Sequence, residues 1–72
     1  MKRITFELRE GEEHIQLTQL LKATNLVFNG AEAQAAVAEG LVQRNGRQET
    51  RKRAKIVRGD VIVFSEYEIS VK

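Results

Sequence analysis

Positively charged side chains gather in one stretch of the chain, between Arg44 and Arg58. This stretch holds seven lysines and arginines against one acid, Glu49, whereas acids outnumber bases in the first forty residues. Such an uneven distribution indicates a polyanionic partner for one face of the molecule, although a solvated surface loop can have the same composition. Arginine can form paired hydrogen bonds to a phosphate or stack on an exposed base, and lysine acts mainly as a point charge. Phosphate binding is therefore the chemistry that these residues offer.

Six side chains of this stretch are the candidate phosphate ligands. Four of them lie close together in the sequence, and two flank a predicted hairpin. They are Arg51, Lys52, Arg53 and Lys55 in the first group, and Arg44 and Arg47 in the second. Arg58 either extends the same face or is simply solvated beside Asp60.

Residue types that carry catalysis are scarce. The chain has no cysteine and a single histidine, His14, so neither a thiolate site nor a zinc cluster is expected. The adjacent acids Glu12 and Glu13 precede a predicted helix and are expected to complement its dipole. Gly59 has neither the neighbours of a phosphate-binding P-loop nor those of a dinucleotide-binding turn. We therefore expect a protein that is not an enzyme and that needs no metal or cofactor.

The few aromatic residues have two possible roles. Phe6, Phe28 and Phe64 could stack on nucleic-acid bases. Because the chain has so few aromatic residues and a short chain buries a thin core, we expect these three side chains in the core. Tyr67, on a predicted strand, fits either role.

Length and composition limit the architecture. The chain has 72 residues and a formal net charge of +2, which is enough for one domain, residues 1–72. No apolar run approaches the roughly 20 residues of a membrane span. The first ten residues alternate charged and apolar types, so no signal-peptide apolar region is expected there. The absence of cysteine is compatible with a reducing cytoplasm, and we expect a soluble, cytoplasmic monomer.

The first half of the chain is predicted to form one strand and two helices. Alternating apolar residues predict a half-buried strand over residues 3–8, followed by a turn. Leucines at helical spacing predict a short helix over residues 16–23. Asn29-Gly30 is a suitable cap for a second, alanine-rich helix over residues 31–39, and Gly40 is its expected left-handed stop. Small side chains on the second helix would let the first approach closely.

The second half is predicted to be rich in β-structure. Asn45-Gly46 is a strong signal for a tight hairpin between short strands. A nearly continuous apolar run over residues 61–64 and an alternating run over residues 67–71 predict two more strands. With short strands also expected at residues 41–42, 48–50 and 56–57, the chain is an α+β domain with its helices segregated from the sheet.

These features occur in an order that resembles a known family. The series runs from the leucine helix through Ala38-Glu39-Gly40-Leu41-Val42 and Arg44-Asn45-Gly46 to Val57-x-Gly59-Asp60-x-Ile62. It resembles the RNA-binding domain named after ribosomal protein S-four, also called the αL motif, with a motif core of about residues 15–64. Residues 30–34 and 49–57 are similar to the small stand-alone bacterial members of this family, of the YbcJ type.

The resemblance implies a fold and an RNA-binding surface. The implied fold has two short helices packed on a small, strongly bent, mainly antiparallel sheet. RNA would lie across the start of the second helix, the loop before it and the following β-loops. The backbone N–H groups near Gly30 and Ala31 would suit a phosphate. Family members often have a Ser-Arg pair where this chain has Asn29-Gly30, and the exposed face of its second helix is acidic to neutral, so binding is expected to depend on residues 51–55 and on these backbone donors.

The sequence therefore predicts a non-enzymatic protein that recognises structured RNA, with ribosomal RNA, transfer RNA or the ribosome as candidate partners. Two alternatives stay open. The two short helices could form a helix-turn-helix that binds DNA, although Glu32 and Glu39 on the second helix would repel phosphate. The basic stretch could instead bind an acidic protein partner.

Overall fold

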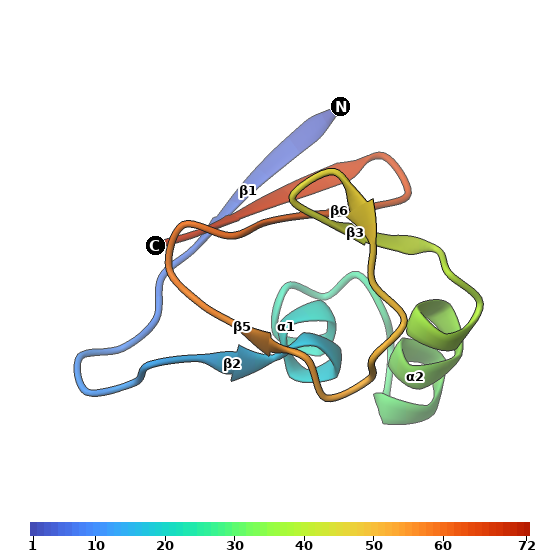
Figure 1. The fold of residues 1–72 in the computed structure, drawn as a ribbon, viewed down its shortest axis with the longest axis horizontal. Helices are drawn as coiled ribbons and strands as arrows, with labels where there is room; N and C mark the ends of the chain where they lie inside the picture. The colour runs from blue at the N-terminus through green and yellow to red at the C-terminus, as the bar shows by residue number, and fades with distance from the viewer.

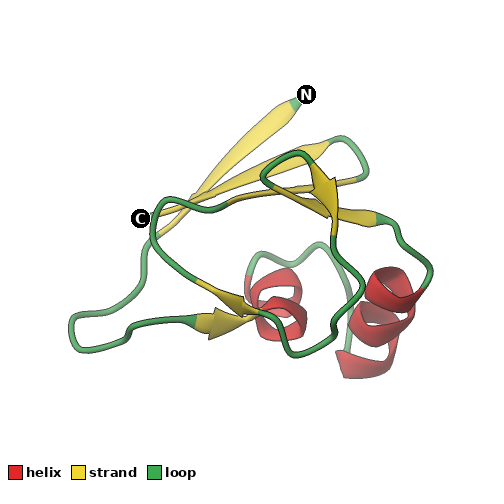
Figure 2. Cartoon of the chain, in the orientation of Figure 1, coloured by secondary structure: helices red, strands yellow, loops and turns green.

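The computed structural model describes all residues from Met1 to Lys72. Figures 1 and 2 show a sheet on one side of the molecule and two helices on the other, as expected for an α+β domain. The five-stranded sheet has the strand order β1-β7-β6-β3-β4, and a separate two-stranded sheet pairs β2 with β5. The strands are β1 (Lys2–Phe6), β2 (Ile15–Gln16), β3 (Val42–Arg44), β4 (Arg47–Gln48), β5 (Lys55–Ile56), β6 (Val61–Phe64) and β7 (Tyr67–Val71).

The five-stranded sheet joins the two ends of the chain. β1 and β7 run parallel, with Ile4 opposite Ile69, and all other pairs in the sheet are antiparallel. Ile69 and its partner Ile62 on β6 are fully buried. The mainly antiparallel sheet predicted from the sequence is thus confirmed, and its parallel edge closes the N-terminal strand onto the last strand of the chain.

The tight hairpin between β3 and β4 follows from its turn residues. Asn45 and Gly46 have φ angles of 52° and 84°, the left-handed conformation that a two-residue hairpin of this kind requires. Asparagine and glycine tolerate this conformation better than other residues, which confirms the predicted hairpin.

The two helices begin within one residue of their predicted starts. Helix α1 (Leu17–Ala23) buries all three of its leucines completely, because they share one face. Helix α2 (Gly30–Ala38) packs Ala33 and Val37 against α1, and Asn29 caps it by accepting a hydrogen bond from the amide of Glu32 at 2.9 Å. Gly40 follows the helix with a φ of 76°, which confirms the expected left-handed stop.

The small sheet of β2 and β5 ties the basic segment to the first helix. Ile15 pairs with Ile56, whose side chain is fully buried. The amide of Leu17, the first residue of α1, donates a 2.9 Å hydrogen bond to the carbonyl of Ala54. The residues that precede β5 are therefore held beside the start of α1. The sequence did not predict β2, and it placed β5 one residue too late.

One apolar core lies between the sheet and the helices. Val42, Ile62 and Ile69 from the sheet meet the leucines of α1 there. Phe6 and Phe64 are half-buried against this core, in line with their expected role. The same expectation for Phe28 is wrong, because 95% of its surface is exposed. In the connection between the helices, Val27 is buried in its place.

Candidate nucleic-acid interface

A polar hollow opens where α1, the first turn of α2 and the segment before β5 meet. Its volume is about 410 Å³, and no hydrophobic or acidic residue lines it. Three of its eight residues are basic, namely Lys22, Lys52 and Arg53. We call this feature the basic hollow. The remaining lining residues are Gln16, Thr18, Gln19, Gly30 and Gln34.

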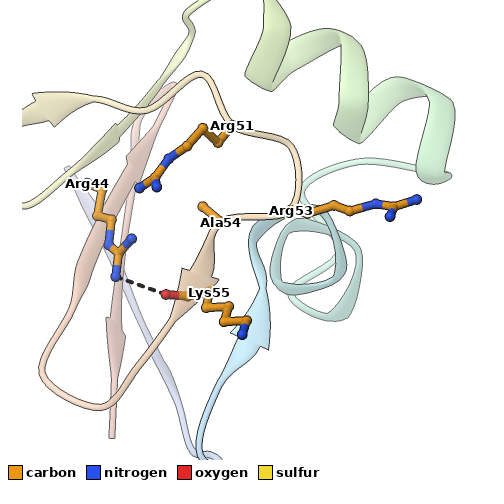
Figure 3. A pocket seen from close by; sticks show the side chains of 5 residues that line it. All are labelled: Arg44, Arg51, Arg53, Ala54 and Lys55. Carbon is orange, nitrogen blue, oxygen red and sulfur yellow. Dashed lines mark hydrogen bonds between the residues drawn. The ribbon is translucent and has the colours of Figure 1, made fainter.

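The turn before β5 positions two of the basic side chains of the hollow, Lys52 and Arg53. Ala54 is buried beneath the segment, whereas Lys52 and Arg53 are exposed. Figure 3 shows Arg53 extending toward the helices, away from Arg51, which points the other way. The small β2–β5 sheet thus directs part of the basic stretch to the start of α2, as the family resemblance implied.

The start of α2 contributes backbone donors at the edge of the hollow. In any helix the first amides have no partner within the helix, and here Asn29 takes that of Glu32. The amides of Gly30 and Ala31 precede it in the first turn, where the helix dipole also favours an anion. The ammonium of Lys22 lies 4.0 Å from the point where a Cβ on Gly30 would stand.

Lys22 is the one basic lining residue that the sequence analysis did not select. Its position on α1, away from the leucine face, showed only that it would be exposed. Its place beside Gly30 depends on how the two helices pack, which no spacing within the sequence reveals. The only sequence signal for Lys22 was its position in the last turn of the first helix, shortly before the cap of the second. This signal is weak.

Arg44, one of the predicted ligands, has a structural role, because its side chain is bound to other parts of the protein. Its guanidinium donates to a carboxylate oxygen of Asp60 at 2.8 Å and to the backbone carbonyl of Lys55 at 2.9 Å, which Figure 3 marks. Glu49 lies 3.5 Å away on the other side. Only 22% of the Arg44 side chain is exposed, so its charge is directed inward.

Asp60 is the centre of this network. It accepts hydrogen bonds from the backbone amide of Val57 at 2.8 Å and from the side chain of Asn45 at 2.9 Å, in addition to Arg44. Burial alone would raise the pKa of Asp60, but the bonds from Val57, Asn45 and Arg44 together hold it below its usual value. Asp60 is therefore an anion that connects the β3–β4 hairpin to the end of β5.

Arg51 is exposed but already paired. Its guanidinium forms two bonds to the carboxylate of Glu49, at 3.0 and 3.1 Å, although 72% of its side chain faces solvent. The bond from Arg51 is the main reason that the pKa of Glu49 lies below its usual value, and the same pair raises the pKa of Arg51. Glu49 therefore offsets much of the positive charge of Arg51.

Four of the other predicted ligands, Arg44, Arg47, Arg51 and Lys55, line two further hollows next to the basic hollow. One, of about 380 Å³, is drawn in Figure 3 and contains Arg53, which also borders the basic hollow. The next contains Arg47 at the hairpin and shares Arg44 and Arg51 with the previous one. The structure thus brings Gly30, Lys52 and Arg53 together in one hollow, and the other predicted basic ligands line the two neighbouring hollows. Ala31 lines none of the three hollows and follows Gly30 in the first turn of α2.

Arg58 is exposed, but it is also bound to the protein's own backbone. Its guanidinium reaches back across the molecule to the loop after β1 and donates to the carbonyls of Arg9 and Glu12 at 3.1 and 2.8 Å. It fastens this loop to the turn before β6. His14 is exposed, no group of histidine or acidic side chains is placed to hold a metal ion, and no helix has the length and apolarity to cross a membrane.

Comparison with known protein families identifies the class to which this fold belongs. The sequence model of the S4 domain matches residues 6–72, which is nearly the whole chain. The protein therefore belongs to the S4 domain family.

Known relatives agree with this assignment. The chain is similar to YbcJ of Escherichia coli (strain K12), with 42% identity over 67 residues that span 93% of this chain and 94% of that protein. A YbcJ protein of Shigella flexneri matches to the same extent. The solution structure of E. coli YbcJ, described as revealing an αL motif involved in RNA binding, matches with a TM-score of 0.71 over 93% of this chain and 84% of that one. The predicted αL fold is thus confirmed.

Proposed function

We propose that this protein binds structured RNA in the cytoplasm, without catalysis, and that the basic hollow is the centre of its binding surface. The observation that carries the proposal is the meeting of Lys22, Lys52 and Arg53 around the start of α2. Several cations without an ion-pair partner beside free backbone amides form an arrangement that favours phosphate binding. The αL motif named for the solved relative supports RNA as the polyanion.

The structure favours RNA over the two alternatives. In a helix-turn-helix protein the second helix enters the major groove of DNA, but here α2 carries Glu32, is followed directly by Glu39 and has no basic residue. An acidic protein partner would need a matching face of carboxylates, whereas neighbouring hollows lined by arginine and lysine suit the successive phosphates of a folded RNA. A monomer that contacts ribosomal or transfer RNA, on or off the ribosome, is the specific form of this proposal.

The test is a charge-matched pair of double variants. Lys52→Ala with Arg53→Ala removes two cations from the hollow, and Lys2→Ala with Arg3→Ala removes two from β1, where they pair with Glu66 and Glu68. Affinity for a labelled RNA hairpin is measured by fluorescence anisotropy over a range of salt concentrations. The first variant should bind on the order of 10- to 100-fold more weakly. The slope of the logarithm of its binding constant against the logarithm of salt concentration should be smaller by about 2.

The control variant should bind nearly as well as the parent. Equal losses of RNA affinity in the two variants would show that only net charge matters, and would contradict the role proposed for the basic hollow. Tighter binding to duplex DNA than to the RNA hairpin at matched salt would overturn RNA as the ligand. Crosslinking in cells and sequencing of the bound RNA then distinguishes ribosomal from transfer RNA.

A further inference from the structure

Phe28 is an aromatic side chain that the fold does not use. It lies directly before Asn29, the cap of α2, where an apolar residue often packs onto the fourth residue of the helix, here Ala33. That contact is not made, because 95% of Phe28 is exposed while Ala33 is completely covered by other residues. Val27 supplies the apolar contact of this connection instead.

The position of Phe28 beside the basic hollow is the informative feature. A single exposed apolar side chain is ordinary on a protein surface. Phe28, however, borders a smaller hollow of about 240 Å³ whose lining includes Lys22, and Lys22 also lines the basic hollow. Gly30, at the edge of the basic hollow, is only two residues further along the chain. The ring therefore stands next to the residues proposed to bind phosphate.

The chemistry around the ring favours a base over a phosphate. The smaller hollow contains Glu32, whose carboxylate would repel a phosphate, together with the apolar side chains of Leu26 and Val27. An exposed aromatic face stacks readily on an unpaired base, and RNA-binding proteins recognise unstacked bases in this way. Lys22, between the two hollows, is placed to bind the phosphate of the same nucleotide.

We propose that Phe28 stacks on an unpaired base of the bound RNA, next to the part of the RNA backbone held in the basic hollow. This inference rests on the proposed RNA-binding function and narrows its substrate class. The preferred RNA has an unpaired nucleotide, in a bulge or loop, adjoining a helical segment. A fully paired RNA would fill the basic hollow and leave Phe28 without a partner.

The test compares two RNA hairpins that differ by one unpaired nucleotide. The bulged hairpin carries 2-aminopurine as the extra base, so stacking is observed as quenching of its fluorescence. The parent protein should bind the bulged hairpin more tightly and quench the probe. Phe28→Ala should weaken binding to the bulged hairpin by roughly 5- to 150-fold and abolish quenching, and leave affinity for the paired hairpin unchanged.

Two further variants separate stacking from simple apolar contact. Phe28→Trp should retain quenching and affinity, whereas Phe28→Leu, which is apolar but has no ring, should lose the quenching. Because the side chain is so exposed, all three variants should unfold at the same temperature as the parent. Equal effects of Phe28→Ala on the two hairpins, or no effect on either, would overturn the proposal.

Other outcomes separate this inference from the proposed function. If Phe28→Ala behaves like the parent while Lys52→Ala with Arg53→Ala fails to bind, the proposed RNA-binding function is supported and the stacking role of Phe28 is wrong. If the parent binds neither hairpin, the proposed function itself fails. Self-association of the parent without RNA that Phe28→Ala abolishes would assign the ring to a second copy of the chain and also overturn the stacking role.

Discussion

The basic side chains of this protein divide into two groups by what accepts their hydrogen bonds. Arg44 and Arg58 donate to groups of the protein itself, Arg44 to Asp60 and Arg58 to backbone carbonyls. Lys52 and Arg53 make no ion pair within the molecule and border the basic hollow. Residue type alone does not separate the groups, because the nearest acceptor decides whether an arginine braces the fold or remains available to a ligand.

Asp60 provides the first prediction at this scale. Replacing it with alanine removes the acceptor of Val57, Asn45 and Arg44 at once and leaves the Arg44 guanidinium largely buried without its closest partner. We expect Asp60→Ala to lower the free energy of unfolding by about 2–4 kcal/mol, measured by urea denaturation. Glu66→Ala, which breaks an exposed pair with Lys2, should cost at most about 1 kcal/mol. Similar losses in both variants would contradict the role given to Asp60.

The roles of single residues could be predicted from the sequence only in part. The basic stretch and Asn29 were identified because residue type and local spacing carry the signal. The pairing of Arg51 with Glu49, two residues apart, depends on the local backbone conformation, which the sequence does not specify. Phe28 was assigned to the core because a short chain with few aromatic residues was expected to bury them, and no local pattern revealed its exposure.

Among the elements, the short β2–β5 sheet and the start of α2 position the site. β5 is anchored by the buried side chain of Ile56, and the hydrogen bond between Leu17 and Ala54 fixes the basic segment against α1. α2 is fixed by its cap and by its contact with α1. The basic hollow forms because the segment before β5 and the start of α2 are both held against α1.

Removal of the cap tests the contribution of α2. Asn29→Ala leaves the amide of Glu32 without its acceptor, so we expect stability to fall by about 1 kcal/mol, measured by thermal or urea unfolding. Asn29→Ser retains a capping oxygen and should stay close to the parent. An unchanged stability in Asn29→Ala would show that the helix start is held by other contacts.

Elements with a long, regular pattern were predictable. The leucine spacing of α1, the alanine-rich α2 and the alternating strands at both ends gave boundaries within about two residues of those observed. β2, with two residues, is too short to show a period. The parallel pairing of β1 with β7 also escaped prediction, since alternation shows that a strand has a buried face but not which strand it joins.

The whole molecule has three neighbouring hollows that share arginines, from the helices to the β3–β4 hairpin, although its net charge is only +2. Local concentration of cations, rather than total charge, therefore distinguishes this face. Two buried acids, Glu49 and Asp60, hold the loops that line these hollows through their hydrogen bonds. Their ionisation links the shape of the surface to pH.

This link predicts loss of stability in acid. The pKa values of Glu49 and Asp60 are lowered on folding, so their contribution is complete above their unfolded values of about 4 and is lost as pH falls through the folded values. We expect the free energy of unfolding, measured by urea denaturation, to be nearly constant from pH 7 to 5 and to drop toward pH 3. Glu49→Gln should be less stable at pH 7 and less sensitive to acid. A parent protein as stable at pH 3 as at pH 7 would contradict this account.

The central claim is that RNA docks on the basic hollow, and an NMR titration of the labelled protein with an RNA hairpin tests it most directly. The account predicts saturable shifts concentrated at the amides of Lys22, Gly30, Lys52 and Arg53, with little change along the β1–β7 edge of the sheet. Shifts centred on that edge, or no saturable shift with any structured RNA, would contradict it.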